Sequence, residues 1–185
     1  MPLAQREEDT KFQSVFIAKT NSGIKSLADM KGKQVSFGSQ SSTSGHLMPR
    51  SFLLQANIEP EKDFKRIAYS GAHDATIASV VSGKVDAAAL DITVWQKFVT
   101  ENKVNTQDVN VFFTTPPYFN YNWSVHADMP VQQREKIKAA LLGLNPTNPE
   151  HAEILKLNRA TRYVTTTPEN YKGLESAARS AGLLQ

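Results

Sequence analysis

The sequence predicts an α/β fold built on a largely parallel sheet. Between residues 34 and 102, three β-like runs are each followed by a segment with helical spacing, and this alternation is typical of parallel strands joined by crossover helices. Of the 185 residues, 40% are hydrophobic, and they form no long apolar run. The chain is therefore expected to bury one or two small cores and not to span a membrane.

The elements follow in order along the chain. A strand is expected at residues 14–18, and a short helix at about residues 26–30. The alternating part predicts strands at residues 34–38, 64–71 and 85–90, and helices at about 45–55, 72–84 and 91–102. Two more strands are expected at residues 108–115 and 121–127. From Pro130 onward, proline at a helix start and apolar spacing predict mostly helix, and the last helix falls within residues 165–184.

Composition excludes several classes of function. The 21 basic and 18 acidic residues are scattered and give a net charge of only +3, so nucleic-acid binding is not expected. The absence of cysteine excludes thiol catalysis and a disulfide scaffold. The four histidines, at positions 46, 73, 126 and 151, lack the spacing of metal ligands. The polar, acidic start MPLAQREEDTKFQ does not have the pattern of a secretory signal, so none is expected in it.

A serine loop (residues 38–44) lies where a predicted strand passes into a predicted helix, and it contains four consecutive hydroxyl residues, at positions 41–44. The N–H groups at a helix start carry partial positive charge, and short hydroxyl side chains add donors without blocking approach. An anion with several oxygen atoms suits this arrangement. One Ser or Thr that simply caps the helix is the alternative. No Walker pattern occurs.

A second strand-to-helix junction follows at Gly71 and His73. In a parallel sheet such junctions lie along one edge, so His73 and the serine loop are expected to line one cleft, where the imidazole would donate to an anion. Alternatively, His73 or Asp74 caps its own helix. Hydrolytic catalysis is not expected, because no G-x-S-x-G elbow occurs and Asp74 is badly placed to orient the ring of His73.

Aromatic residues surround a Pro-Pro pair in the segment TTPPYFNYNW, residues 114–123. Tyr118, Tyr121 and Trp123 either form the wall of a binding cleft or pack as an ordinary loop. The segment is informative only in combination with the two junctions.

These motifs in this order, SLADMKGKQVSFGSQSSTSGH, YSGAHDATIASVVSGKVDAAAL, TTPPYFNYNWSV and NYKGLESAARSAGLL, closely resemble the substrate-binding components of phosphonate, phosphite and phosphate ABC importers. The resemblance covers residues 12–184. It implies a type 2 periplasmic binding fold, with two α/β lobes joined by crossover strands, and binding of an oxyanion without chemical change. It therefore implies no enzyme and no cofactor, an ABC transporter permease as partner, and a periplasmic location.

The resemblance also assigns ligand-binding residues. The family's Ser-Thr-Ser anion motif falls on Ser42, Thr43 and Ser44, and its histidine falls on His73. Thr93 and Tyr121 stand where relatives that bind aminoalkylphosphonates carry acidic residues for the ligand's amine. Asp91, close to Thr93, is able to substitute in part. The pattern predicts a preference for a small inorganic oxyanion or a simple alkylphosphonate.

Family members are longer, and this chain starts near the first crossover strand, so the N-terminal third of the family pattern is missing. We expect a complete α/β lobe at residues 22–110, which carries the serine loop, and a partial second lobe at residues 1–21 and 111–185. Uncovered edges of the partial lobe predict self-association, including domain swapping of a strand or helix. The alternative function is that of a truncated, ligand-free fragment that acts only as an oligomeric structural or interaction module.

Overall fold

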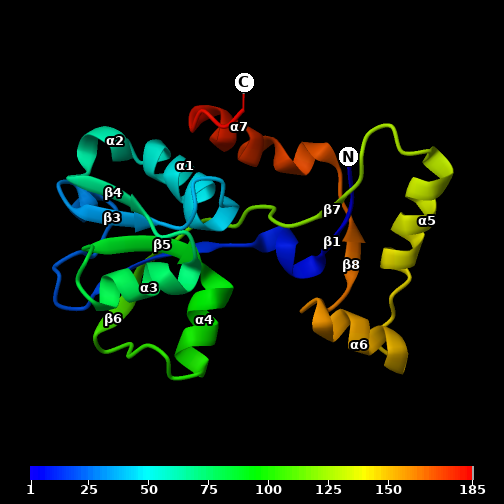
Figure 1. The fold of residues 1–185 in the computed structure, drawn as a ribbon, viewed down its shortest axis with the longest axis horizontal. Helices are drawn as coiled ribbons and strands as arrows, with labels where there is room; N and C mark the ends of the chain where they lie inside the picture. The colour runs from blue at the N-terminus through cyan, green and yellow to red at the C-terminus, as the bar shows by residue number, and fades with distance from the viewer. Residues whose placement is uncertain (185) are drawn as a thin grey trace. The chain divides into compact units, whose positions relative to one another are not determined.

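The computed structural model describes residues 1–184, which form two compact units (Figure 1). The larger unit comprises Gln13–Pro116 together with the residues from Leu174 onward. The smaller unit comprises Met1–Phe12 and Pro117–Gly173. The ranges expected from the sequence differ from these, because residues 13–21 and 111–116 and the end of the chain belong to the larger unit. The strands at Ser14–Lys19 and Val109–Thr114 pair with each other inside the larger sheet, whereas the end of the chain is helical.

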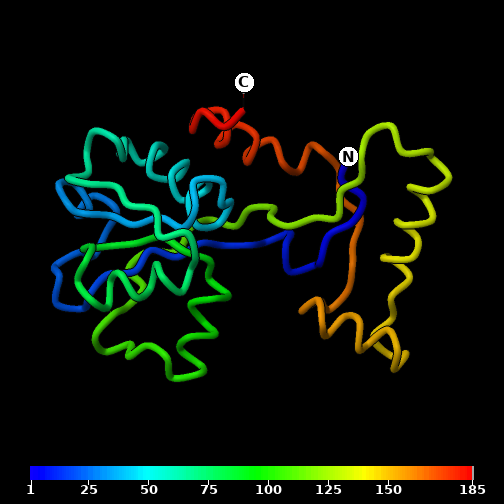
Figure 2. Tube along the Cα trace, viewed as in Figure 1, coloured from blue at the N-terminus to red at the C-terminus, as the bar shows by residue number. Residues whose placement is uncertain are grey.

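The larger unit contains a five-stranded sheet in the order β4-β3-β5-β2-β6. Its strands are β2 (Ser14–Lys19), β3 (Gln34–Phe37), β4 (Arg66–Tyr69), β5 (Ala87–Asp91) and β6 (Val109–Thr114). β3 runs parallel to β4 and β5, whereas β2 runs antiparallel to β5 and β6. The expectation of a largely parallel sheet was therefore wrong for half of the pairings. Figure 2 shows the first and last of these strands side by side.

Helices cover both faces of this sheet. α1 (Met48–Gln55) and α2 (Pro60–Asp63) lie on one face, and α3 (His73–Val81) and α4 (Ile92–Thr100) lie on the other (Figure 1). β2 alternates between two cores: Phe16 packs with Leu53 on the first face, and Ile17 packs with Ile77 on the second. A 3₁₀ turn (Ala28–Met30) replaces the short helix expected near residue 28.

The smaller unit has a three-stranded antiparallel sheet in the order β7-β1-β8. Its strands are β1 (Pro2–Arg6), β7 (Trp123–Ser124) and β8 (Tyr163–Thr165), and its helices are α5 (Val131–Leu142) and α6 (Pro149–Leu157). Two 3₁₀ helices (Glu7–Lys11 and Pro168–Tyr171) complete it. The last helix, α7 (Lys172–Ser180), passes from this unit into the larger one. The sequence analysis predicted mostly helix from Pro130 onward, which α6 bears out, but it did not single out α6 as an element and did not predict β1 or β8.

The direction of the strands decides where the site lies. β3, β4 and β5 all point the same way, so the segments that follow them leave from one edge of the sheet. The serine loop follows β3, the Gly71 turn follows β4, and α4 follows β5. Candidate binding residues from distant parts of the sequence therefore meet at this edge, as expected for strands of this kind.

Candidate anion-binding site

The serine loop ends in a capped helical turn. Ser42 has extended backbone angles, and its Oγ accepts a hydrogen bond of 3.0 Å from the Gly45 N–H. A π-helical turn (Thr43–Leu47) follows and runs directly into α1. Capping and anion binding were alternatives for this loop, and Ser42 performs the capping. The first N–H groups of a helix have no partners within it, so Thr43 and Ser44 stand where an anion would find donors.

Contacts from other strands hold this turn in place. The Ser44 carbonyl accepts a 2.7 Å hydrogen bond from the hydroxyl of Ser14, the first residue of β2. The Ser14 N–H donates in turn to Thr115 Oγ1, at 3.0 Å. Ser44 is buried, whereas Thr43 is only half-buried. Of the two, Thr43 has the hydroxyl better placed to reach a ligand.

Gly45 permits a very close approach of neighbouring groups. A β-carbon built on it would lie 2.9 Å from Ser42 Oγ, 3.0 Å from His73 Cε1 and 3.2 Å from Gly38 Cα. The Gly38 N–H also donates to the Gly45 carbonyl, at 2.9 Å. The imidazole of His73 therefore lies directly against the start of the helical turn, as the parallel-edge argument predicted.

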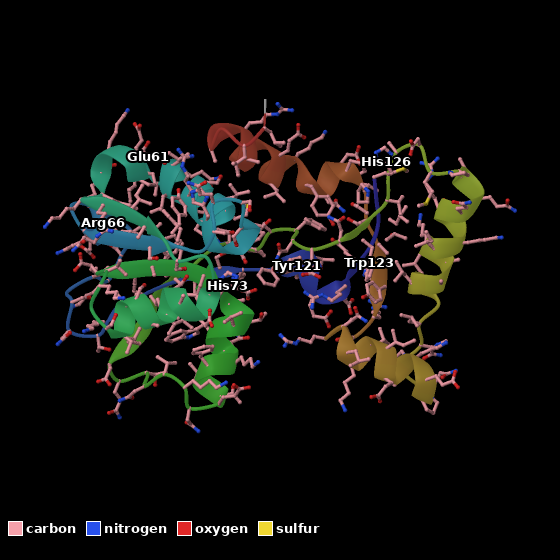
Figure 3. The ribbon with its side chains drawn as sticks, viewed as in Figure 1. Glu61, Arg66, His73, Tyr121, Trp123 and His126 are labelled. Atoms are coloured by element: carbon pink, nitrogen blue, oxygen red, sulfur yellow. The ribbon has the colours of Figure 1, made fainter. Side chains whose placement is uncertain are left out.

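His73 is the first residue of α3, where Figure 3 labels it. Ala72 is the N-cap of α3, and its own side chain makes no capping bond. Asp74, in the first turn, accepts a 2.8 Å hydrogen bond from the Ala75 N–H through Oδ1, so the alternative of a contact with the helix start holds in part for Asp74. His73 makes no such contact, because its Nδ1 faces the Asp91 N–H. The Asp91 N–H lies 3.5 Å from His73 Nδ1, a long contact in which Nδ1 is the acceptor. Burial lowers the pKa of His73, while the charges of Asp91 and Asp74 oppose the shift. In the neutral ring this contact leaves the proton on Nε2, a single directional donor.

Asp91 and Thr93 are bound to each other. Asp91 caps α4: its Oδ1 accepts hydrogen bonds from Thr93 N–H at 2.6 Å, Thr93 Oγ1 at 2.7 Å and Val94 N–H at 3.3 Å. Asp91 is also buried, with 5% of its surface exposed. The structure therefore brings both residues to the same sheet edge as the serine loop, but it commits one carboxylate oxygen of Asp91 to the helix start.

Tyr121 belongs to the smaller unit, where it is 56% exposed. Its ring stands edge-on to Phe12, and the Arg6 guanidinium lies 5.7 Å from its centroid. With Trp123, it lines a cavity of about 400 Å³ in this unit. Tyr118 is buried against Phe12 as ordinary loop packing, the alternative that the sequence left open for this segment.

Three residues near the serine loop were not selected from the sequence: Ser14, His46 and Tyr69. Ser14 looks like any strand residue, and only the fold brings its hydroxyl to Ser44. His46 is buried behind the loop, with its ring nitrogens bonded to Gln40 and Tyr69. A lone histidine two positions beyond a serine run carries no local signal of such contacts.

The arrangement suits recognition of an anion. A helix start, short hydroxyls and a neutral imidazole donor converge at one edge of the larger sheet. Among residues 1–184, no group of three or more His, Cys, Asp and Glu side chains is placed to hold a metal ion. Within the same range, no helix is long and apolar enough to cross a membrane.

Comparison of folds identifies the class. The structure of PhnD1 from Prochlorococcus marinus MIT 9301, in complex with methylphosphonate, superposes with a TM-score of 0.87 and 35% identity, covering 100% of this chain and 72% of that one. A putative periplasmic sulfonate-binding protein, SsuA from Methylobacillus flagellatus KT, superposes over 100% of this chain and 62% of its own, with a TM-score of 0.62 and 17% identity. The fold is that of type 2 periplasmic binding proteins, which confirms the predicted class.

The chain belongs to the family described as the periplasmic substrate-binding protein of phosphonate ABC transporters, whose model matches residues 1–171. It is 38% identical, over 96% of its length, to the probable ABC transporter phosphite binding protein PhnD1 of Prochlorococcus marinus MIT 9301. It spans 63% of the length of that relative. The predicted family is confirmed, and it is a family of transport components, not of enzymes.

Proposed function

We propose that this chain binds a small phosphorus oxyanion, namely a phosphonate, phosphite or phosphate, in the periplasm as the substrate-binding component of an ABC importer. The observation that carries the proposal is the contact of His73 with Gly45, which sets an imidazole donor against the helix start that Ser42 caps. The names of the related proteins, which mention phosphite, phosphonate and methylphosphonate, point to the same ligand class.

Binding would replace the water around the anion by fixed donors. The N–H groups at Thr43 and Ser44, the Thr43 hydroxyl and the His73 Nε2–H supply these donors, and each charge-assisted hydrogen bond contributes about 1.5–3 kcal/mol. Tyr121 stays a predicted ligand residue, as the family resemblance implies. An ABC transporter permease is the proposed protein partner.

The acidic groups favour ligands without an amine. An ammonium group is held best by a carboxylate with both oxygens available, and Oδ1 of Asp91 already accepts three hydrogen bonds at the start of α4, which leaves only Oδ2 for a ligand. Thr93 carries no charge, and its hydroxyl donates to the same oxygen. We therefore propose phosphite, phosphate or methylphosphonate ahead of 2-aminoethylphosphonate.

A second candidate function is that of an oligomeric interaction module without a ligand. It is favoured by the apolar side chains that the smaller unit exposes: Trp123 is 51% exposed, Val131 63% and Leu157 77%. A ligand titration separates the two functions.

The test is isothermal titration of the chain with phosphate, phosphite, methylphosphonate and 2-aminoethylphosphonate, in a buffer without phosphate or sulfate. Saturable binding of one of the first three, weakened at least about tenfold in Thr43→Ala, is the expected result. Thr106→Ala is the matched control, because Thr106 is exposed just before β6, at the opposite end of the strands. A folded chain that binds none of the four ligands contradicts the proposal. The oligomeric interaction module is then the function that remains. Preference for the aminophosphonate contradicts only the ligand ranking.

A further inference from the structure

His46 is buried behind the serine loop and bonded through both ring nitrogens. Its Nδ1 lies 2.7 Å from the Gln40 carbonyl oxygen. A carbonyl only accepts hydrogen bonds, so Nδ1 carries the proton and donates. In the neutral ring Nε2 is then an acceptor, and the hydroxyl of Tyr69 donates to it at 3.2 Å. The two contacts together specify one tautomer.

Aromatic packing fixes the plane of the same ring. The centroids of Phe37 and Tyr69 each lie 5.0 Å from that of His46, and Tyr69 meets it edge-on at 90°. Phe37 ends β3 and Tyr69 ends β4, so His46 is held by both strands that lead into the two junction loops. The whole of His46 has only 4% of its surface exposed.

Burial lowers the pKa of His46, and two charged groups of opposite sign act on the same ring. Arg50 on α1 lowers the pKa of His46 and Glu61 on α2 raises it, and these two side chains form a 2.9 Å ion pair. Figure 3 labels Glu61 on its helix. Burial is the largest of these influences. The ring is therefore neutral near pH 7, as the two hydrogen bonds require.

We propose that His46 is a positioning residue for the anion donors: its neutral ring, fixed as the Nδ1–H tautomer, ties the Gln40 carbonyl to the helical turn and so sets the place of Thr43 and Ser44. The inference rests on the proposed function of the serine loop. Gln40 and Ser41 are exposed, and a turn bond from Ser42 N–H to the Ser39 carbonyl, 3.1 Å long, lies beside them. The bond from His46 links this exposed stretch to the buried face of the turn.

The variants His46→Asn and His46→Leu separate the effect of the hydrogen bond to Gln40 from the effect of side-chain volume. The amide nitrogen of asparagine stands one bond beyond Cγ, as Nδ1 does, and retains the donor to Gln40. Leucine retains apolar volume but leaves the Gln40 carbonyl without this donor. We expect methylphosphonate affinity about tenfold weaker in His46→Leu and within about threefold of the parent in His46→Asn. The control is His126→Leu, because the His126 side chain is 83% exposed and lies in the smaller unit.

A readout that needs no ligand completes the test. Long-range ¹H–¹⁵N spectra of the parent chain at pH 7 should show the Nδ1–H tautomer for His46, and Tyr69→Phe should weaken that preference. Hydrogen exchange at amides 41–45 should accelerate by at least about tenfold in His46→Leu and not in His46→Asn.

An Nε2–H tautomer, or unchanged exchange and affinity in His46→Leu, overturns the inference. If the parent chain binds no anion, the proposed function fails, and the spectra and exchange rates still decide the role of His46 in ordering the loop. Should His46→Leu not fold, the other two variants decide: a clear loss of affinity in His46→Asn, or an unchanged tautomer preference in Tyr69→Phe, overturns the inference.

Discussion

The imidazole of His73 lies against the backbone of Gly45, at a distance that leaves no room for a β-carbon on the glycine. Gly45 follows the last residue of the serine loop and His73 begins α3, so the contact joins the two junctions of the proposed site. Two loops that are distant in the sequence thereby hold a fixed relation to each other.

Gly45→Ala is expected to damage both the site and the fold. The added methyl group would stand 3.2 Å from Gly38 Cα, which is backbone and yields only if the loop moves. Overpacking of this kind costs about 1–3 kcal/mol of unfolding free energy, and displacement of the loop should weaken anion affinity by at least about tenfold. Urea unfolding and calorimetric titration measure the two effects.

Gly173→Ala is the matched control for that substitution. Gly173 lies in α7, and a β-carbon there meets nothing within 4 Å. The control should leave affinity unchanged and stability equal or slightly higher, because alanine favours helix. Equal behaviour of the two variants would show that the close approach at Gly45 has no energetic importance.

Asp91 is expected to act as a helix cap and not as an amine clamp. Asp91→Ala should lower the free energy of unfolding by about 1–2 kcal/mol, and Asp91→Asn by less, because asparagine caps helices well. The affinity ratio of methylphosphonate to 2-aminoethylphosphonate should not change in Asp91→Asn. A selective loss of the aminophosphonate in that variant would identify Asp91 as the group that holds an amine.

Stability is expected to fall as the pH drops below about 6.5. The pKa values of His46 and His73 are lowered by burial from an ordinary value of 6.5. Below that pH the unfolded chain binds protons that the folded chain does not, so the free energy of unfolding becomes smaller as the pH falls.

The pKa of Glu61 is lowered by its ion pair with Arg50, and stability from that group is lost only below its ordinary value of 4.5. The two effects therefore occupy separate pH ranges. Urea midpoints at about pH 7.5 and 5.5 measure the histidine effect, and His46→Asn should flatten the slope between them. An equal slope in parent and variant would argue against a lowered His46 pKa.

The smaller unit is expected to associate with a second copy of the chain. None of the residues of α5 (Val131–Leu142) is buried, and the buried core of this unit centres on Ala4, Leu155 and Tyr163. Leu157 is 77% exposed, and apolar surface of this kind marks interaction sites. Light scattering across a wide concentration range should show a rise in mass that Leu157→Glu reduces. A monomer at every concentration would contradict the prediction.

Local sequence signals predicted the elements of the larger unit and the place of the serine loop. Strand-to-helix alternation and a run of hydroxyl residues are properties of neighbouring positions, and neighbours are all that a single sequence displays. The direction of β2 is not local: it depends on where the chain enters the unit, so the antiparallel pairings with β5 and β6 escaped prediction.

The missed elements of the smaller unit have different causes. β1 has the buried Gln5 at its fourth position, where its Oε1 accepts a hydrogen bond from Tyr171, and a glutamine there masks the strand pattern. β8 has three residues, too few for a pattern. α6 begins with the Asn148 cap and Pro149, a start signal that was present but not used. The contacts of His46 depend on Gln40 and Tyr69 meeting one ring, which only the folded chain shows.

β2 lies between β5 and β6, and both of these partners come from much later in the chain. The segment from β3 to β5 is continuous, and its parallel pairings close shorter loops. Because the entropy cost of closing a loop rises with its length, the pairings of β2 are expected to form after the parallel part. In refolding, β3 and the serine loop that follows it would then form before β2 brings Ser14 to Ser44. Docking of β2 would be the step that limits the folding rate.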